Sequence, residues 1–523
     1  MFRLLIVRLL FAGLLVVSVS VGAFTVSGTV SAGDQPIPGA LVTATTADGI
    51  AVSVYADAGG RFSIGGSASG PVELRARAPG FEDAKVAAAD GGQVKIVVSP
   101  AADPMPLATS SQLLALLPEG EQKRRFIMDC TSCHEINHAR VWKDGVIRDQ
   151  TKWTEAITLM KAMDVYALIS PQIDVTRYST WLATYLSPER IATIHPGPRV
   201  DLAAIHAATI TEFPVPVATE LPHDLGIGPD GRIWVTGFWT SVMWAMDPKT
   251  GKIDTYAVAE KSDTPAQVRA LAFDKKGMLW IVLGGSKSVV RLDPRTRKFR
   301  TYPVGMYAHD VVLDSRGNVW INDYFSKPER IAKLDPVSEK VTIYYLPSSN
   351  LSEAYGKPLP YGLMIDGEDR LWATTLAGNT LVRFDTRTTK SKLYKMPESL
   401  SGPRRHAIGN DGSVWIPEYN TGYLTRFDPK TETFERFNLG NSTLGPYAVI
   451  VDRRNGAIWI TGSLDSSLVR FDAKTHAIER YPLPTEPAYA RHMAIDAKSG
   501  AVWTAYSSLP TAVPKIVRLD RRD

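Results

Sequence analysis

Both cysteines of the chain lie in one short motif, Cys130-Thr131-Ser132-Cys133-His134. In an exported chain, a single pair at this spacing could form a small disulfide, a redox dithiol or a covalent haem attachment. The adjacent histidine favours haem, because two thiols so spaced can bond to both vinyl groups and place the imidazole on the proximal side of the iron. A redox dithiol needs no histidine there. The motif therefore predicts one covalent haem c, held by Cys130 and Cys133, with His134 as an axial iron ligand.

The sixth iron ligand is expected to be a thioether or a second imidazole from a separate segment. Met160 and Met163 are the candidates, since His138 is too close to His134 in the sequence to reach the opposite haem face. The run from Trp153 to Met160 resembles the short cytochrome c domains of quinohaemoprotein-type enzymes, and this resemblance implies Met160 as the distal ligand. Two alternatives stay open, namely that both methionines pack in a helical core or that the sixth position is open.

Helices are expected to position these groups. A helix-compatible stretch, 119–129, runs into the motif, and the segments 153–163 and 174–186 have apolar residues at helical spacing. Together they predict a small α-helical cytochrome c domain over residues 107–192. Linkers rich in proline, at 100–106 and 195–198, separate this domain from the segments on either side.

The first residues of the chain resemble a secretory signal peptide. Arg3 and Arg8 form a positive region, an apolar stretch covers 9–17, and Val21-Gly22-Ala23 is a plausible cleavage site. The apolar run is shorter than the roughly 20 residues of a membrane span, although an uncleaved anchor is an alternative. No cysteine lies near the site for lipid attachment. We expect residues 1–23 to be removed, leaving a periplasmic protein with no membrane span in the mature chain.

Charge and composition exclude several classes of protein. The 523 residues are 44% hydrophobic and 22% charged, which is typical of a globular chain of several domains. The formal net charge is +5, and two of the positive charges lie in the predicted signal peptide. A balance this small provides no basic surface for nucleic acid. We therefore expect no nucleic-acid partner.

A repeat fills the C-terminal part of the chain. Short alternating strands recur at intervals of roughly 40–50 residues, the mark of a β-propeller. Strand-like residues 210–214 precede the first repeat, and the last repeat lacks an outer strand. Borrowing that strand would complete a seventh blade, so we predict a seven-bladed propeller over residues 209–523. One tryptophan marks each repeat: Trp234, Trp280, Trp320, Trp372, Trp415, Trp459 and Trp503.

The repeat pattern resembles the streptogramin B lyase (virginiamycin B lyase-like) propeller family. That resemblance implies catalytic His and Glu residues at the ends of inner strands, in a Glu-x-His set with a second Glu fourteen residues after the His. No blade carries the full set: His309 has Asp323 fourteen residues later but Tyr307 before it, and Glu418 has Arg404 at the histidine position. We keep His309, Asp323 and Glu418 as catalytic candidates; the incomplete set argues against the family's lyase activity, which stays an alternative.

A polar ring is expected at one mouth of the propeller channel, where each innermost strand begins. It carries three arginines and two histidines, which favour an anionic or carbonyl-bearing ligand or a carboxylate of a partner. Alternatively the ring is an ordinary wet channel lining, and Asp323 and Glu418 pair with its arginines. Counting back from each blade tryptophan gives its members: His223, Arg269, His309, Tyr361, Arg404, Tyr447 and Arg491.

Residues 24–99 are rich in Gly, Ala, Val and Thr, with strand-like alternation. The runs Pro38-Gly39-Ala40 and Ala78-Pro79-Gly80-Phe81 resemble the carboxypeptidase regulatory-like β-sandwich, which implies an accessory domain without catalytic residues. The whole chain is thus predicted to be mainly β and multidomain, with a β-sandwich, a small α-helical cytochrome c domain and a C-terminal propeller.

Three functions are compatible with this organisation. The first is electron transfer coupled to binding or oxidation of a small, possibly anionic, substrate or of a redox partner at the propeller. A periplasmic electron donor or acceptor protein is then required, because a single haem takes one electron at a time. The second is a lyase or hydrolase on the propeller, and the third is a non-catalytic redox or ligand sensor.

Overall fold

The computed structural model describes residues 22–68, 72–103, 105–132, 134–163, 173–194, 202, 208–260, 262, 264–349, 359–508 and 512–521. Most of the predicted signal peptide lies outside these residues, and its last two positions begin the first strand. None of the helices in the described parts is both long and apolar enough to cross a membrane.

The N-terminal part is a sandwich of two sheets around a core of small and β-branched side chains. One sheet contains β1 (Gly22–Ala32), β2 (Gln35–Pro36), β5 (Arg61–Ala68) and β8 (Gln93–Val97). Strands of the other sheet run in the order β4-β3-β6-β7. Their bounds are β3 (Leu41–Thr45), β4 (Ala51–Tyr55), β6 (Val72–Arg77) and β7 (Ala84–Ala88).

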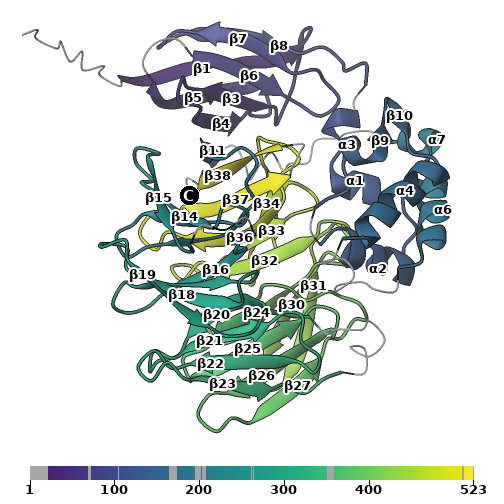
Figure 1. Cartoon of the computed structure of the whole chain (residues 1–523). Coiled ribbons are helices and arrows are strands. Elements are labelled where there is room, and N and C mark those ends of the chain that lie inside the picture. The colour runs from purple at the N-terminus through teal and green to yellow at the C-terminus, as the bar shows by residue number, and fades with distance from the viewer. Residues whose placement is uncertain are drawn as a thin grey trace, which may run out of the picture.

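A helical segment, residues 105–194, follows the sandwich and lies beside the propeller (Figure 1). The three helices expected from the sequence are present as α2 (Glu121–Cys130), α4 (Gln150–Lys161) and α6 (Val175–Tyr185). Asp149 and Asp174 cap α4 and α6 by accepting backbone N–H groups of the first turn. The shorter elements are η1 (Met105–Leu107), α1 (Ser110–Ala115), α3 (His138–Val141), β9 (Trp142–Lys143), β10 (Val146–Ile147) and α7 (Pro188–Ile191).

The C-terminal part contains six separate four-stranded antiparallel sheets within the described residues, each a hairpin-connected run. The first three blades are β12 (Pro222–Ile227), β13 (Ile233–Gly237), β14 (Val242–Met246) and β15 (Ile253–Ala257); β16 (Val268–Phe273), β17 (Leu279–Leu283), β18 (Ser288–Leu292) and β19 (Phe299–Pro303); β20 (Ala308–Leu313), β21 (Val319–Asp323), β22 (Arg330–Leu334) and β23 (Val341–Tyr345). The next three are β24 (Pro360–Ile365), β25 (Arg370–Thr375), β26 (Thr380–Asp385) and β27 (Ser391–Lys395); β28 (Ala407–Ile408), β29 (Val414–Glu418), β30 (Tyr423–Asp428) and β31 (Thr433–Asn438); β32 (Pro446–Val451), β33 (Ile458–Gly462), β34 (Ser467–Phe471) and β35 (Ile478–Pro482).

The seventh blade closes as the sequence predicts. Strands β36 (Ala490–Ile495), β37 (Val502–Ser508) and β38 (Ala512–Arg521) are completed by β11 (Ala208–Pro214), which pairs antiparallel with β38. The outer edge of β11 is not exposed, however, because β4 of the sandwich pairs with it. The resulting sheet has eight strands, in the order β36-β37-β38-β11-β4-β3-β6-β7. The sandwich therefore extends the last blade, and in Figure 1 β11 lies between β4 of the sandwich and β38 of the blade.

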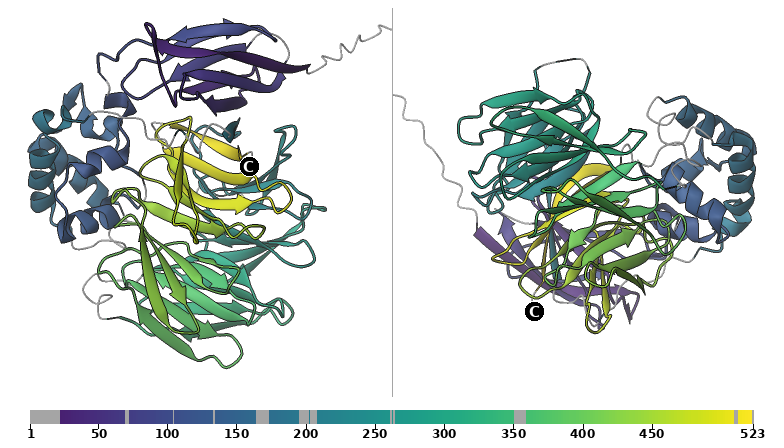
Figure 2. Two further views of the ribbon diagram at one scale, coloured as in Figure 1. Left: turned by 180° about the vertical axis from the view of Figure 1, so that it is seen from behind. Right: turned by 90° about the horizontal axis from the view of Figure 1, so that it is seen from below.

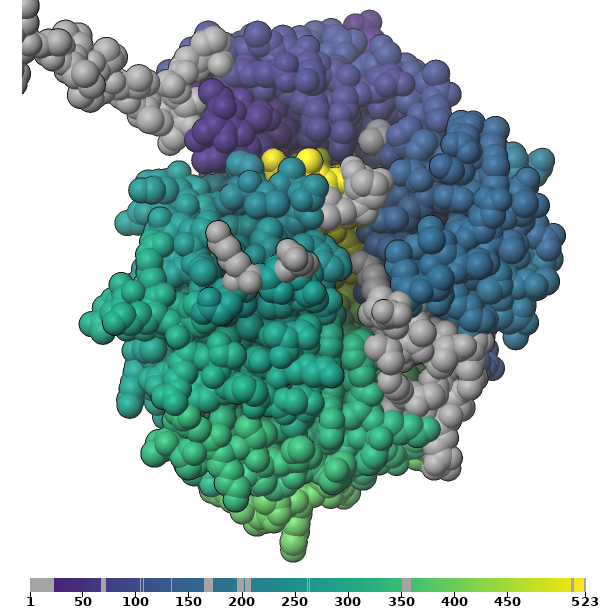
Figure 3. All heavy atoms as spheres, in the orientation of Figure 1, coloured from purple at the N-terminus to yellow at the C-terminus, as the bar shows by residue number. Residues whose placement is uncertain are grey.

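The helical segment shares a hydrophobic core with the propeller. Buried side chains from α1, α2 and α6 belong to the same cluster as buried residues of the blades, including Tyr361, Tyr419, Tyr447 and Tyr489. Views from behind and from below show the helices against one end of the propeller (Figure 2). In the space-filling view the sandwich, helices and propeller form one continuous body (Figure 3). The helical segment thus covers the mouth at which the polar ring was predicted.

Candidate functional site

The cysteine motif lies at the end of α2, where the helix meets the propeller. The backbone N–H and the hydroxyl of Thr131 both donate to the carbonyl of Ile127, which ends the helix just after Cys130. Cys130 is half-buried, and Cys133 lies outside the described residues. The carbonyl oxygen of Thr131 accepts from the hydroxyls of Tyr419, at 2.8 Å, and Tyr489, at 2.5 Å. Two propeller blades therefore hold the loop that carries the motif.

The imidazole of His134 is oriented as an iron ligand would need. Its Nδ1 lies 3.1 Å from the carbonyl oxygen of Glu135, so the Nδ1–H donates there and Nε2 keeps its lone pair. Burial, with a smaller contribution from Arg140, lowers the pKa of His134 to about 4, which keeps the ring neutral. The carboxylate of Glu135 is itself buried and accepts from Asn137 and Ser508. The residues present therefore fit an axial histidine.

Both candidate sulfur ligands border the same cavity as His134. Met160 is half-buried in the last turn of α4, whereas the side chain of Met163, just beyond the helix, is 46% exposed. Neither methionine is a fully buried core residue. Of the two, Met160 is the better enclosed.

The seven ring positions lie at the start of the innermost strands, and β-bulges aim their side chains. In six blades the register between the first and second strands shifts across the ring position, for example between Pro222 and Leu225 around His223. A bulge re-aims a side chain that would otherwise follow the pleat. The fifth blade differs: Arg404 precedes β28, and isolated bridges flank it at Pro403 and Arg405.

Ring residues of neighbouring blades touch one another. Nδ1 of His223 lies 2.8 Å from a carboxylate oxygen of Asp224, and its Nε2 lies 3.1 Å from the guanidinium of Arg269. This network assigns a neutral ring with the proton on Nδ1. Burial, then Arg269, lower the pKa of His223 well below its usual range. On the other side, the hydroxyls of Tyr361 and Tyr447 meet in a short hydrogen bond.

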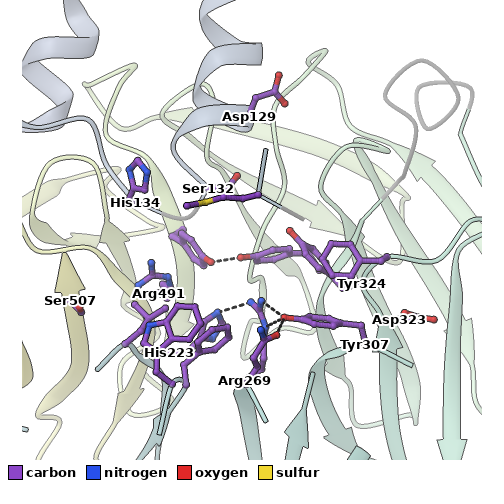
Figure 4. Close-up of a pocket in the computed structure, with 18 of the residues that line it drawn as sticks. Asp129, Ser132, His134, His223, Arg269, Tyr307, Asp323, Tyr324, Arg491 and Ser507 are labelled. Atoms are coloured by element: carbon purple, nitrogen blue, oxygen red, sulfur yellow. Dashed lines mark hydrogen bonds between the residues drawn. The ribbon is translucent and has the colours of Figure 1, made fainter. Parts of the chain in front are cut away.

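A cavity of about 890 Å³ lies between the cysteine motif and the ring, within the size range of cofactor and ligand sites, roughly 300–1,000 Å³. Figure 4 shows Asp129, Ser132 and His134 above it and the propeller side chains below. The helical segment contributes Asp129, Cys130, Ser132, His134, Arg140, Met160 and Met163 to its lining. The propeller contributes, among others, His223, Phe238, Trp239, Arg269, Tyr307, Asp323, Tyr324, Phe325, Tyr361, Tyr447 and Arg491.

Two ring residues do not border the cavity, which corrects the predicted funnel. Arg404 is fully buried: its guanidinium stacks 3.6 Å from the ring centroid of Tyr419 and donates to the hydroxyl of Ser132 at 3.0 Å. It thus holds the motif loop and faces no open space. His309 is also fully buried, with Nδ1 3.2 Å from the carbonyl oxygen of Tyr361.

The three catalytic candidates are not assembled into one acid–base site. Asp323 borders the cavity, but its carboxylate pairs with Arg330 at 2.6 Å. Glu418 is fully buried away from the cavity and accepts two hydrogen bonds, of 2.7 and 2.9 Å, from Arg436. Both carboxylates therefore have arginine partners, but these arginines come from the same blades and not from the ring.

Sequence reasoning missed four tyrosines that belong to the site. Tyr307 and Tyr324 border the cavity, and Tyr419 and Tyr489 hold the motif loop. Their positions repeat: Tyr307 and Tyr489 lie two residues before a ring position, while Tyr324 and Tyr419 lie four residues after a blade tryptophan. The count that located the ring would have found them. What it could not show is that the helical segment covers this end of the channel.

Comparison with known proteins agrees with the propeller and the sandwich. Residues 354–517 match the virginiamycin B lyase family, and residues 25–99 match the carboxypeptidase regulatory-like domain. A streptogramin B lyase structure superposes on 60% of this chain and 98% of its own with a TM-score of 0.53 and 22% identity. Virginiamycin B lyase from Staphylococcus aureus covers 60% of this chain and all of its own, also with a TM-score of 0.53, at 19% identity. A search of curated proteins found no match.

These likenesses concern the fold. At such identities they establish a virginiamycin B lyase-like propeller in a chain that is mainly β and multidomain, with an N-terminal carboxypeptidase regulatory-like domain. They do not extend to the helical segment, so the haem and the cytochrome c assignment remain predictions from the cysteine motif.

Proposed function

We propose that this protein is a periplasmic c-type haem protein that transfers single electrons, and that a ligand or redox partner engages it at the cavity between the helical segment and the propeller. The single observation that carries the proposal is the shared cavity. Cys130 and His134 border it from one side, and His223, Arg269 and Arg491 border it from the other. A group bound at the propeller mouth would thus lie next to the site of the haem.

The chain's own residues fit this role. Cys130 and Cys133 would hold the haem, His134 would bind the iron through Nε2, and Met160 is the candidate for the opposite side. A haem bound in this way supplies one-electron redox chemistry. Burial lowers the pKa of His134 and keeps the ring neutral, and because Nδ1–H faces the carbonyl of Glu135, Nε2 is the nitrogen left unprotonated for the iron. Arg404 and the tyrosines of the propeller fix the loop between the two cysteines.

Haem attachment is tested first. The full chain is produced with its N-terminus in a host that exports and matures c-type cytochromes, and covalent haem is measured by haem staining of denaturing gels and by the pyridine haemochrome spectrum. One haem per chain is expected, and Cys130→Ala should lose covalent attachment at that thiol. Thr158→Ala, at an exposed position of α4 that does not border the cavity, is the matched control and should retain haem. Wild-type protein without covalent haem would refute the proposal.

The iron ligands are tested by spectroscopy of the same preparations. Met160→Leu should remove the absorption of a sulfur–iron bond in the ferric protein, and Met163→Leu should leave it in place. The reverse result would assign Met163, and an unchanged spectrum in both variants would exclude methionine ligation.

Electron transfer is tested by exposing ferric protein, without oxygen, to a panel of alcohols, aldehydes, sugars and carboxylates and to periplasmic fractions. Reduction by one small compound indicates a dehydrogenase-type role, and reduction by a protein fraction alone indicates an electron carrier. If nothing reduces the haem, electron transfer through this cavity is refuted.

The family match of residues 354–517 supports a second candidate, a lyase acting on a streptogramin B-like ring. Against it, the carboxylates of Asp323 and Glu418 are engaged by Arg330 and Arg436. Incubating the purified protein with a streptogramin B and following loss of the intact compound separates the two candidates, since enzymatic loss would favour the lyase.

A further inference from the structure

Arg269 borders the cavity, and among the described residues its side-chain hydrogen bonds all go to neutral groups. Its guanidinium donates twice to the hydroxyl of Tyr307, at 2.6 and 3.2 Å, and once to Nε2 of His223, at 3.1 Å. Tyr307 in turn donates to the amide oxygen of Gln267. Among the described residues, no carboxylate forms an ion pair with Arg269. A guanidinium stays charged in a protein, and a poorly solvated charge without a counter-ion is costly.

The cavity lining as a whole carries more positive than negative charge. Five cationic side chains border the cavity, namely Arg140, Arg269, Lys287, Arg330 and Arg491, against two carboxylates, Asp129 and Asp323. One of those carboxylates, Asp323, is already paired with Arg330. The cavity is therefore electropositive, and an anion that enters it would be attracted toward Arg269.

Aromatic rings flank Arg269 on two sides. The ring centroid of Phe238 lies 4.9 Å from its guanidinium carbon, and those of Tyr307 and Tyr324 lie at 5.1 and 5.9 Å. Trp239 packs edge-on against Phe238 at 4.5 Å and is 47% exposed, an unusual exposure for so large an apolar side chain. Figure 4 shows Arg269 and Tyr307 joined across the base of the pocket, with Tyr324 above them.

We infer that this cavity binds a small aromatic carboxylate, with its carboxylate on Arg269 and its ring between Phe238–Trp239 and Tyr307–Tyr324. The cation without a counter-ion selects the acid group, because charge-assisted hydrogen bonds to a guanidinium are the strong ones. The flanking rings select a flat apolar body, which stacks well on aromatic side chains. This inference rests on the proposed function, since it names the ligand of the cavity that Cys130 and His134 also border.

A carboxylate at Arg269 could also come from a propionate of the haem itself. Both ligands would present a carboxylate to Arg269, so the experiment must separate a haem propionate from a free aromatic acid. Haem-loaded, full-length protein is titrated with benzoate, with neutral benzamide and with acetate, and binding is followed by calorimetry and by tryptophan fluorescence. Benzoate should bind at least roughly tenfold more tightly than either benzamide or acetate, as loss of a charged hydrogen bond or of the ring contact would predict.

Variants locate the site. Arg269→Gln should weaken benzoate binding at least roughly tenfold. The matched control is Arg297→Gln, because Arg297 also stacks on a tyrosine, 4.4 Å from the ring of Tyr256, but lies outside the cavity and is half exposed. It should change binding less than about twofold. If Arg269→Gln does not fold, Trp239→Ala tests the ring contact at an exposed side chain, and should weaken benzoate about fivefold while leaving acetate unchanged.

Three results would overturn the inference. Equal binding of benzoate and benzamide would exclude a carboxylate site, and equal binding of benzoate and acetate would exclude the aromatic contacts. Absence of benzoate binding by the haem-loaded protein, together with a changed haem potential in Arg269→Gln, would assign Arg269 to a propionate. The haem assay is independent of these titrations. If the haem assay finds no covalent haem in the wild-type protein and that protein still binds benzoate, the proposed function is rejected and the carboxylate site is retained.

Discussion

The carbonyl of Thr131 binds the cysteine motif to the propeller, and removing the hydroxyls that donate to it should lower the local stability of the motif loop. The hydroxyls of Tyr419 and Tyr489 both reach this oxygen, and they lie 2.8 Å from each other. Both tyrosines are fully buried. No other described group donates to this carbonyl. The perturbation is therefore the pair of substitutions Tyr419→Phe and Tyr489→Phe, made singly and together, which remove the hydroxyls and leave the rings packed.

The expected loss of local stability follows from the fact that both hydroxyls donate to one carbonyl. Each single variant leaves the carbonyl with one donor and should cost about 1 kcal/mol, the net value of an ordinary hydrogen bond. The double variant strips a buried carbonyl of both donors, and an unsatisfied buried acceptor costs about 1–3 kcal/mol more. We therefore expect the double variant to lose about 3–5 kcal/mol, which exceeds the sum of the two single losses by about 1–3 kcal/mol.

Amide hydrogen exchange of the full-length protein measures this local opening directly, from the exchange rates of peptides that cover α2 and the following loop. The control is Tyr345→Phe, because the side chain of Tyr345 is 62% exposed on the outer strand β23 and should show no change. If the double variant loses no more than the two single variants together, within about 0.5 kcal/mol, the two hydroxyls do not share the carbonyl and the argument for a propeller-held loop is wrong.

Three further outcomes are expected. Deleting residues 24–99 removes β4 from the edge of β11, so the truncated protein should melt at a lower temperature and associate through that edge, as thermal unfolding and light scattering would detect; a monomer of unchanged stability would contradict this. Glu418→Gln should destabilise the fold by about 2–3 kcal/mol, because it removes the buried carboxylate that accepts two hydrogen bonds from Arg436 and leaves that arginine, among the described carboxylates, only the longer pair with Glu398, at 3.6 Å. It should not alter ligand binding at the cavity, and denaturant unfolding and calorimetry separate the two effects. A loss of binding without a loss of stability would restore Glu418 as a site residue. Burial acts to raise the pKa of Asp411, but hydrogen bonds from Ser413 and Arg426 lower it from 3.8 to about 2, so the carboxylate should stabilise the fold above pH 4 and lose that contribution as the pH falls through 2. Because the side chain is 57% exposed, Asp411→Asn should cost only about 1 kcal/mol of unfolding free energy at neutral pH and nothing below pH 2. A loss of stability that persists in acid would refute this assignment.

The sequence predicted the features that depend on local or periodic patterns. Seven tryptophans at a regular interval fix the blades, since each repeat is one hairpin-connected sheet that buries the same positions. The spare strand ahead of the first repeat was assigned correctly to the last blade, because an outer strand without a partner leaves an edge that must be closed. Helices around the cysteine motif were located for a similar reason, from helix-compatible composition and apolar spacing.

The tertiary structure decided what each ring residue can do. From the sequence, Arg404 and Arg491 were equivalent members of one polar ring. In the structure Arg404 is stacked on Tyr419 and bonded to Ser132, whereas Arg491 borders the cavity. The difference comes from the helical segment, more than 200 residues away in the chain, which covers one part of the mouth and leaves another open. The pairing of β4 with β11 arises in the same way.

The sequence by itself therefore determined the cysteine motif, the repeat and the positions of the ring, because residue spacing and strand periodicity are properties of neighbouring residues. The tertiary structure alone decided that the motif and the ring border one cavity, that Asp323 and Glu418 are paired within their own blades, and that Arg269 is left facing the cavity. The cavity and the position of Arg269 in it depend on how the helical segment packs against the propeller, a contact between residues far apart in the chain. The ion pairs of Asp323 and Glu418 depend instead on how the strands of one blade are arranged.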